Sequence, residues 1–121
     1  MKVLLIDDEE NIVTIMRLTL ADAGHDVLTA SNGQEGRSLY MQHLASGAPF
    51  EVVVTDFRMP IKDGGEVIRE IFAVRPDQKI IVVSAYSYEI TDSAHTIPRD
   101  KVRIIHKPFD PDDLVRLVQS I

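Results

Sequence analysis

The chain contains no cysteine among its 121 residues. Disulfide frameworks, thiolate zinc sites and cysteine nucleophiles are therefore excluded. Histidine does not supply a metal set in their place, because the spacings of the four match no zinc pattern; they are His25, His43, His95 and His106. A Gly-x-Gly-x-x-Gly motif and a phosphate-binding loop are also missing, so we expect no nucleotide site.

The chain also lacks an excess of basic residues and any long apolar run. Its 13 basic residues stand against 19 acidic ones, a formal net charge of −6. An acidic domain of this kind is a poor candidate for direct binding to nucleic acid. No stretch approaches the roughly 20 apolar residues of a membrane span, and Asp7 and Asp8 end the N-terminal run too early for a signal peptide. We expect a cytoplasmic protein without membrane contact.

The length and composition are those of one globular domain. Domains most often have roughly 100–150 residues, and a chain of this size folds without a metal or disulfide. Hydrophobic residues make up 45% and charged residues 26%, which rules out a disordered or collagen-like chain. With no internal repeat and no interior linker, the prediction is a single domain over residues 1–121.

Five short apolar runs are typical of β-strands. Most of them lack strict alternation, which indicates strands buried on both faces, as in a parallel sheet. Polar residues interrupt the second run, so we expect it at an edge. The runs cover residues 3–6, 26–30, 52–55, 80–84 and 102–105.

Helical periodicity is found between and after these runs. Ser31 with Gln34 predicts a capping box before the second helix, and Asp110-Pro111 supplies a cap and a first-turn proline for the last. The apolar stripes at helical spacing are Ile12, Ile15, Met16 and Thr19; Gly36, Leu39, Tyr40, His43 and Leu44; Val67, Ile68, Ile71 and Phe72; and Leu114, Leu117, Val118 and Ile121.

Residues 86–99 have a weaker helical pattern. They contain several poor helix formers, so we expect a short, irregular or mobile helix there. Strand–helix alternation through the whole chain predicts an α/β domain with a parallel sheet. Right-handed crossovers place helices on both faces of that sheet.

Polar side chains stand where four of the predicted strands end. Asp7 and Asp8 follow the first strand, and Asp56 follows the third. Ser84 ends the fourth strand, and Lys107 follows the fifth. Ligands of open parallel sheets bind outside the carboxyl ends of the strands, so these side chains converge if the four strands are neighbours. Crowded carboxylates repel one another unless a cation joins them, and oxygen ligands of this kind suit Mg²⁺.

A Mg²⁺ ion beside an ammonium would make a place for a phosphoryl group. A carboxylate that touches both the ion and the phosphorus is then a candidate nucleophile, and it would form an acyl phosphate. Ser84 would donate a hydrogen bond to the phosphoryl oxygens, and Lys107 would neutralise their charge. Each residue also has a separate structural explanation as a turn, cap or surface residue. One site, however, accounts for all five positions together.

Four stretches stand out by their order and spacing: residues 4–9, 54–60 with 63–64, 82–85 and 107–109. Together they resemble the receiver domain of response regulators in two-component signalling, over essentially the whole chain. The resemblance implies a doubly wound, flavodoxin-like fold, with a five-stranded parallel sheet in the order 2-1-3-4-5 and helices on both faces.

The resemblance also implies roles for the acidic residues. In the family a central aspartate accepts a phosphoryl group, which makes Asp56 the implied phosphoacceptor. Asp8 and Asp56 would ligate Mg²⁺ directly, with the backbone carbonyl of Arg58 as a third protein ligand. Asp7 would act mainly through water.

Ser84 then matches the switch hydroxyl and Lys107 the phosphate-pairing lysine, and the Lys107-Pro108 bond is typically cis in relatives. The implied donor is a histidine kinase or a phosphotransfer protein. An output domain or partner protein would respond, and a phosphorylation-linked dimer is a further expectation. From the acidic composition, we expect no direct contact of this domain with nucleic acid.

The sequence departs from the family on the usual output face. Ile104 stands where an aromatic residue is usual, and residues 93–100 lack the Ala- and Gly-rich pattern of relatives. Since Ile104 has no ring to swing, we expect any switching to run through residues 86–99, directly after Ser84.

Two other functions compete with this reading. One is a Mg²⁺-dependent phosphatase with an aspartate nucleophile, but that class carries its nucleophile after the first strand and needs a cap domain. The other is a pseudo-receiver that only binds a partner, which the complete set of acidic residues, Ser84 and Lys107 disfavours. We therefore expect a phosphorylation-controlled switch and not an enzyme with an external substrate.

Overall fold

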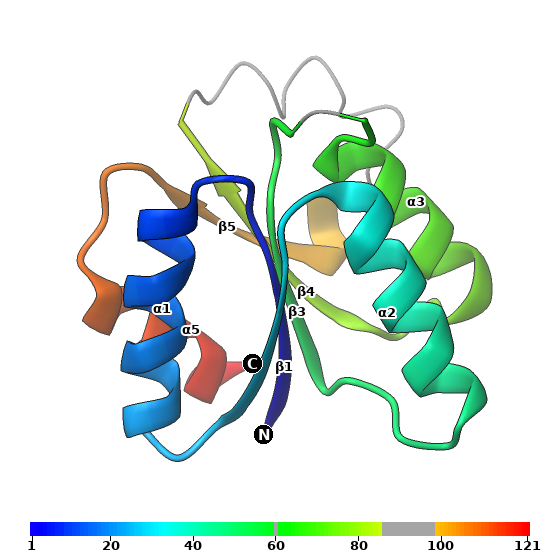
Figure 1. Cartoon of the computed structure of the whole chain (residues 1–121), viewed down its shortest axis with the longest axis horizontal. Helices are drawn as coiled ribbons and strands as arrows, with labels where there is room; N and C mark the ends of the chain where they lie inside the picture. The colour runs from blue at the N-terminus through cyan, green and yellow to red at the C-terminus, as the bar shows by residue number, and fades with distance from the viewer. Residues whose placement is uncertain (60, 86–98) are drawn as a thin grey trace.

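The computed structural model describes residues 1–59, 61–85 and 99–121. Five parallel strands form one sheet in the order β2-β1-β3-β4-β5 (Figure 1). The predicted order and the edge position of the second strand are confirmed. Each strand lies within one residue of its predicted bounds: β1 Lys2–Ile6, β2 Asp26–Ala30, β3 Val52–Asp56, β4 Lys79–Ser84 and β5 Val102–His106.

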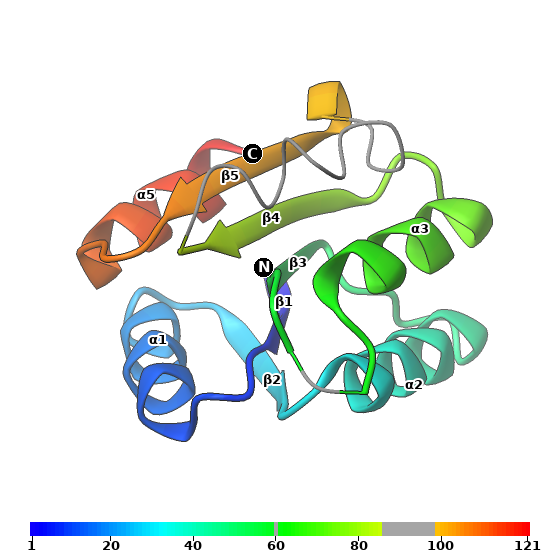
Figure 2. The ribbon, with the colours of Figure 1, turned by 90° about the horizontal axis from the view of Figure 1, so that it is seen from above.

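Helices cover both faces of the sheet, as expected for a doubly wound fold (Figure 2). Helices α1 and α5 lie on one side of the strands, and α2 and α3 lie on the other. A short 3-10 helix, η1, precedes β5. The bounds are α1 Glu10–Asp22, α2 Gly33–Ala45, α3 Gly64–Val74, η1 Arg99–Lys101 and α5 Pro111–Ser120.

Alternate residues of each central strand enter two separate hydrophobic clusters. Val3 and Leu5 of β1 pack in one cluster with Leu20 of α1. Leu4 and Ile6 point the other way and pack in the second cluster, which includes residues of α2 and α3. Because both faces of the sheet are buried, the central strands are apolar throughout.

Two helix details differ from the predictions. The cap of α2 is Asn32, whose side chain accepts a hydrogen bond from the Glu35 backbone N–H at 2.8 Å. Ser31 instead donates to the Glu35 carboxylate, so the predicted Ser31–Gln34 box lies one residue too early. Ile15 of α1 is 52% exposed, because this helix buries a narrow stripe centred on Met16.

The predicted start of the last helix is confirmed, whereas the helix predicted at residues 86–99 lies almost entirely outside the described residues. Asp110 caps α5 by accepting from the Asp112 N–H, with Pro111 in the first turn. The expectation of an irregular helix at 86–99 falls on residues that are not described, apart from Arg99, which begins η1. No helix among the described residues is long and apolar enough to cross a membrane.

Candidate functional site

The carboxyl ends of four neighbouring strands meet at one edge of the sheet. Strand β3 pairs with both β1 and β4, and β4 pairs with β5. Asp7 directly follows β1, while Asp56 and Ser84 are the last residues of β3 and β4. Lys107 follows β5, and its backbone N–H donates to the Ser84 carbonyl at 2.8 Å. The sheet order thus gathers side chains that lie up to 100 residues apart in sequence.

Asp7, Asp8 and Asp56 form an acid cluster in which each offers a carboxylate oxygen within 4.8 Å of the others. Asp7 and Asp56 are only 1% and 6% exposed, whereas Asp8 is exposed. One carboxylate oxygen of Asp7, Oδ2, is buried and accepts no hydrogen bond. An all-oxygen set with an unsatisfied buried oxygen fits a hard cation such as Mg²⁺.

Asp56 is held firmly by its backbone surroundings. Its Oδ1 accepts a hydrogen bond from the Phe57 N–H at 2.9 Å, and its carbonyl accepts from the Thr55 hydroxyl at 2.9 Å. The first turn of α3 lies against this residue, since a Cβ added to Gly64 would come within 2.4 Å of the Asp56 carbonyl oxygen. Only glycine permits so close an approach.

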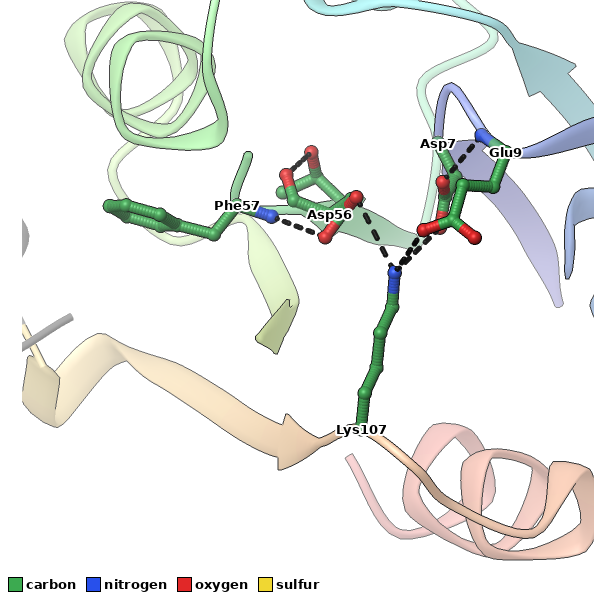
Figure 3. A network of polar contacts seen from close by, with 6 residues as sticks. Asp7, Glu9, Asp56, Phe57 and Lys107 are labelled. Atoms are coloured by element: carbon green, nitrogen blue, oxygen red, sulfur yellow. Dashed lines mark hydrogen bonds and ion pairs between the residues drawn. The ribbon is translucent and has the colours of Figure 1, made fainter. Parts of the chain in front are cut away.

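Lys107 reaches across the cluster from the end of β5, between Asp56 on one side and Asp7 and Glu9 on the other (Figure 3). Its Nζ lies 3.5 Å from Asp56 Oδ2 and 3.7 Å from Asp7 Oδ2. Glu9 Oε1 is nearer, at 3.3 Å. Burial lowers the pKa of Lys107, but the carboxylates of Asp56, Asp7 and Glu9 outweigh it and raise the pKa overall.

The cluster carries more negative charge than Lys107 neutralises. Burial, followed by repulsion from Asp7, raises the pKa of Asp56 to about 7, although Lys107 acts in the opposite direction. Burial also raises the pKa of Asp7. A second cation at the cluster would relieve this repulsion and favour the charged form of both carboxylates.

Ser84 and Arg58 lie beside the cluster. Ser84 is fully buried at the end of β4, and Arg58 is exposed, two residues after Asp56, where it lines a hollow together with Asp8. The Lys107-Pro108 bond is cis, as the resemblance implied. Glu9 was not among the residues predicted for this site, because its contact with Lys107 joins residues 98 positions apart and depends on the tertiary fold.

A doubly wound sheet with three carboxylates and a lysine at the carboxyl ends of its strands is the arrangement of a signalling receiver. The family model described as the response regulator receiver domain matches residues 3–119. The chain therefore belongs to this family, and it is a receiver domain of two-component signalling.

Curated relatives and solved structures agree with this assignment. The chain is 34% identical to the regulator NtrC of Azospirillum brasilense over 97% of its own length and 23% of that protein. It is 30% identical to AruR of Pseudomonas aeruginosa, over 99% and 48% of the two chains. The chain thus spans less than half the length of these relatives.

Two solved structures are similar over nearly the whole chain. A receiver domain protein from Clostridium thermocellum has a TM-score of 0.84 at 29% identity, covering 98% of this chain and 91% of that one. The response regulator TrrA of Thermotoga maritima, solved in complex with Mg²⁺ and BeF, has a TM-score of 0.79 at 32% identity, covering 98% and 96%.

Proposed function

We propose that this chain accepts a phosphoryl group on Asp56 and thereby changes a surface that another domain or protein binds. The observation that carries the proposal is the position of Asp56 among two further carboxylates and the Lys107 ammonium. A carboxylate oxygen of Asp56 attacks the phosphorus of a phosphorylated donor. The bond from phosphorus to the donor breaks, and an acyl phosphate forms.

Mg²⁺ is the cation that we propose for the acid cluster. Asp8 and Asp56 would hold it, together with the backbone carbonyl of Arg58, and Asp7 would act mainly through water. When bound, the ion would neutralise charge on the phosphoryl oxygens. The raised pKa of Asp56 supports this assignment. At a pKa of about 7, the Asp56 carboxyl is protonated in a fraction of the molecules at neutral pH. Only the charged form is a good nucleophile, and a bound cation would favour that form.

Lys107 and Ser84 would act on the transferred group. Lys107 Nζ is 3.5 Å from Asp56 Oδ2, so it is placed to pair with a phosphoryl oxygen attached to that carboxylate. Ser84 ends the adjacent strand and is the residue whose hydroxyl would move toward the phosphoryl group. That movement would reach the output surface through the residues that follow Ser84 in the chain.

The donor would be a histidine kinase or a phosphotransfer protein. An apolar groove next to the acid cluster supports docking of such a protein. Lys107, which contacts Asp56, forms part of the wall of this groove, so a protein bound there would lie beside the phosphoacceptor. Ile15 of α1 lines the same groove and is 52% exposed. A donor must bring its phosphorus within bonding distance of Asp56, so it has to cover the surface next to Lys107.

Incubation with acetyl phosphate tests the proposed function directly. With Mg²⁺ present, intact-mass measurement should show one added phosphoryl group, and hydroxylamine should remove it, as expected of an acyl phosphate. Chelation of divalent ions should suppress the labelling. Small phosphoesters should not be turned over; steady hydrolysis of them would favour the phosphatase alternative instead.

Replacement of Asp8 by alanine should weaken Mg²⁺ binding by at least roughly tenfold, because it removes a ligand and part of the attracting charge. Titration calorimetry without phosphate measures the affinity. Asp26→Ala is a matched control, since Asp26 is an exposed aspartate at the opposite end of the strands. Wild-type affinity in Asp8→Ala would place the ion elsewhere.

A further inference from the structure

Glu9 occupies the position that should cap α1, but its side chain does not cap the helix. The residue has extended backbone angles, φ −91° and ψ 101°, and makes no side-chain hydrogen bond to the first turn. Serine, threonine, asparagine and aspartate are preferred at such positions because their short side chains reach the free N–H groups. The longer Glu9 side chain reaches across to Lys107 instead.

The contact with Glu9 is the closest that the Lys107 ammonium makes to a carboxylate in the described part of the chain. Its distance of 3.3 Å is shorter than those to Asp56 and Asp7. Among these three contacts it is also the one that meets hydrogen-bond geometry. A single positive charge is thus shared by three carboxylates, and the shortest of the three contacts is the one to the exposed Glu9 side chain.

The Glu9 side chain can leave this contact at little structural cost. It is 57% exposed, so its carboxylate regains water when it swings away. The contact that orders the loop is a different one, because the Glu9 backbone N–H donates to Asp7 Oδ1 at 2.9 Å. Substitution of the side chain therefore leaves the support of Asp7 in place.

Building on the proposed phosphorylation of Asp56, we propose that Glu9 is a positioning residue that holds the Lys107 ammonium at the mouth of the acid cluster and competes with the phosphoryl oxygens for it. A phosphoryl group on Asp56 brings new negative charge next to Lys107. The ammonium then has to give up its hydrogen bond to Glu9 or share it. Glu9 thus sets how readily the site takes up an anion.

Glu9→Gln should bind beryllofluoride about fivefold more tightly than the wild type at saturating Mg²⁺. The substitution removes one negative charge a few ångströms from the anion and weakens the competing contact, and Coulomb energies at this range in a partly hydrated site amount to a few-fold in affinity. Fluorine NMR of the bound anion measures the affinity. Saturating Mg²⁺ keeps any change in metal binding out of the comparison.

Glu10→Gln is the matched control. Glu10 is the next residue, exposed in the first turn of α1, and lines a hollow on the other side of the cluster that Lys107 does not reach. Both variants change the net charge equally, but only Glu9→Gln should tighten anion binding. Unfolding in urea should show similar free energies for Glu9→Gln and the wild type, which separates positioning from helix capping.

The outcomes distinguish this role from the proposed function. Equal affinities in Glu9→Gln and the wild type, or equal gains in Glu9→Gln and Glu10→Gln, would overturn the role of Glu9 and leave the function intact. Weaker binding in Glu9→Gln would also overturn it, because Glu9 would then assist the anion. A wild-type chain that binds no beryllofluoride would overturn the proposed function and this role with it.

Discussion

Asp56→Asn should abolish phosphorylation by acetyl phosphate. Asparagine keeps the size of a side chain that is almost fully buried, but its amide is not a nucleophile toward phosphorus at neutral pH. The neighbouring carboxylates of Asp7 and Asp8 remain, so the variant tests whether either of them accepts the phosphoryl group instead. Intact-mass measurement after incubation with acetyl phosphate and Mg²⁺ gives the answer.

Asp26→Asn is the control for this experiment. Asp26 begins β2 at the far end of the sheet and is exposed, so its loss should leave labelling at the wild-type level. Circular dichroism of Asp56→Asn should match the wild type, which shows that lost labelling is not lost folding. A phosphoryl group still present on Asp56→Asn, mapped by peptide sequencing, would move the acceptor to another residue.

The same substitution should stabilise the fold at neutral and mildly alkaline pH when no divalent ion is present. The pKa of Asp56 is about 7 in the folded chain, against an ordinary value of 3.8. The folded state therefore favours the protonated carboxyl. The stability linked to it is fully present below the ordinary pKa of 3.8 and is lost progressively as the pH rises from there through 7. Asparagine cannot ionise and avoids that loss.

The difference in the free energy of unfolding between Asp56→Asn and the wild type should change little below pH 4. It should then grow in favour of the variant by about 2–4 kcal/mol toward pH 8, because each pKa unit corresponds to about 1.4 kcal/mol. Urea unfolding in the presence of a chelator measures both proteins at each pH. Comparing the two cancels the titration of shared groups that do not interact with Asp56.

Saturating Mg²⁺ should shrink this difference, because the proposed ion would bind the folded wild type through a carboxylate that the variant lacks. A gap between Asp56→Asn and the wild type that stays constant from pH 4 to pH 8 would mean that the Asp56 carboxyl ionises as readily as one in water.

The order and type of the described elements were predictable from the sequence because they depend on local patterns. Central strands buried on both faces read as continuous apolar runs, and β1 and β3 do so. Asp110-Pro111 predicted the start of α5, because an aspartate side chain caps a helix and a proline favours its first turn. The resemblance to a known family then ordered the strands, which is why Asp7, Asp56 and Lys107 could be expected at one edge.

Other features followed from contacts that no local pattern encodes. Gln78 directly precedes β4, and it is buried and accepts a hydrogen bond from the Tyr40 hydroxyl at 2.7 Å. The Gln78 amide donates in turn to the Glu51 carbonyl, and Arg75 donates to the Phe50 carbonyl. These bonds join residues 25 to 38 positions apart, and they form only after the helices pack on the sheet.

By itself, the sequence determined the alternation of strands and helices and the acidic residues and lysine at the strand ends, since strand periodicity and turn chemistry are properties of neighbouring residues. The likeness to receivers came from its resemblance to a known family. Only the tertiary structure decided how the charges are shared. Glu9 and Lys107 are 98 residues apart, and their hydrogen bond exists because β1 and β5 end at the same edge of one sheet. The length of each side chain then selects which carboxylate comes closest to the ammonium.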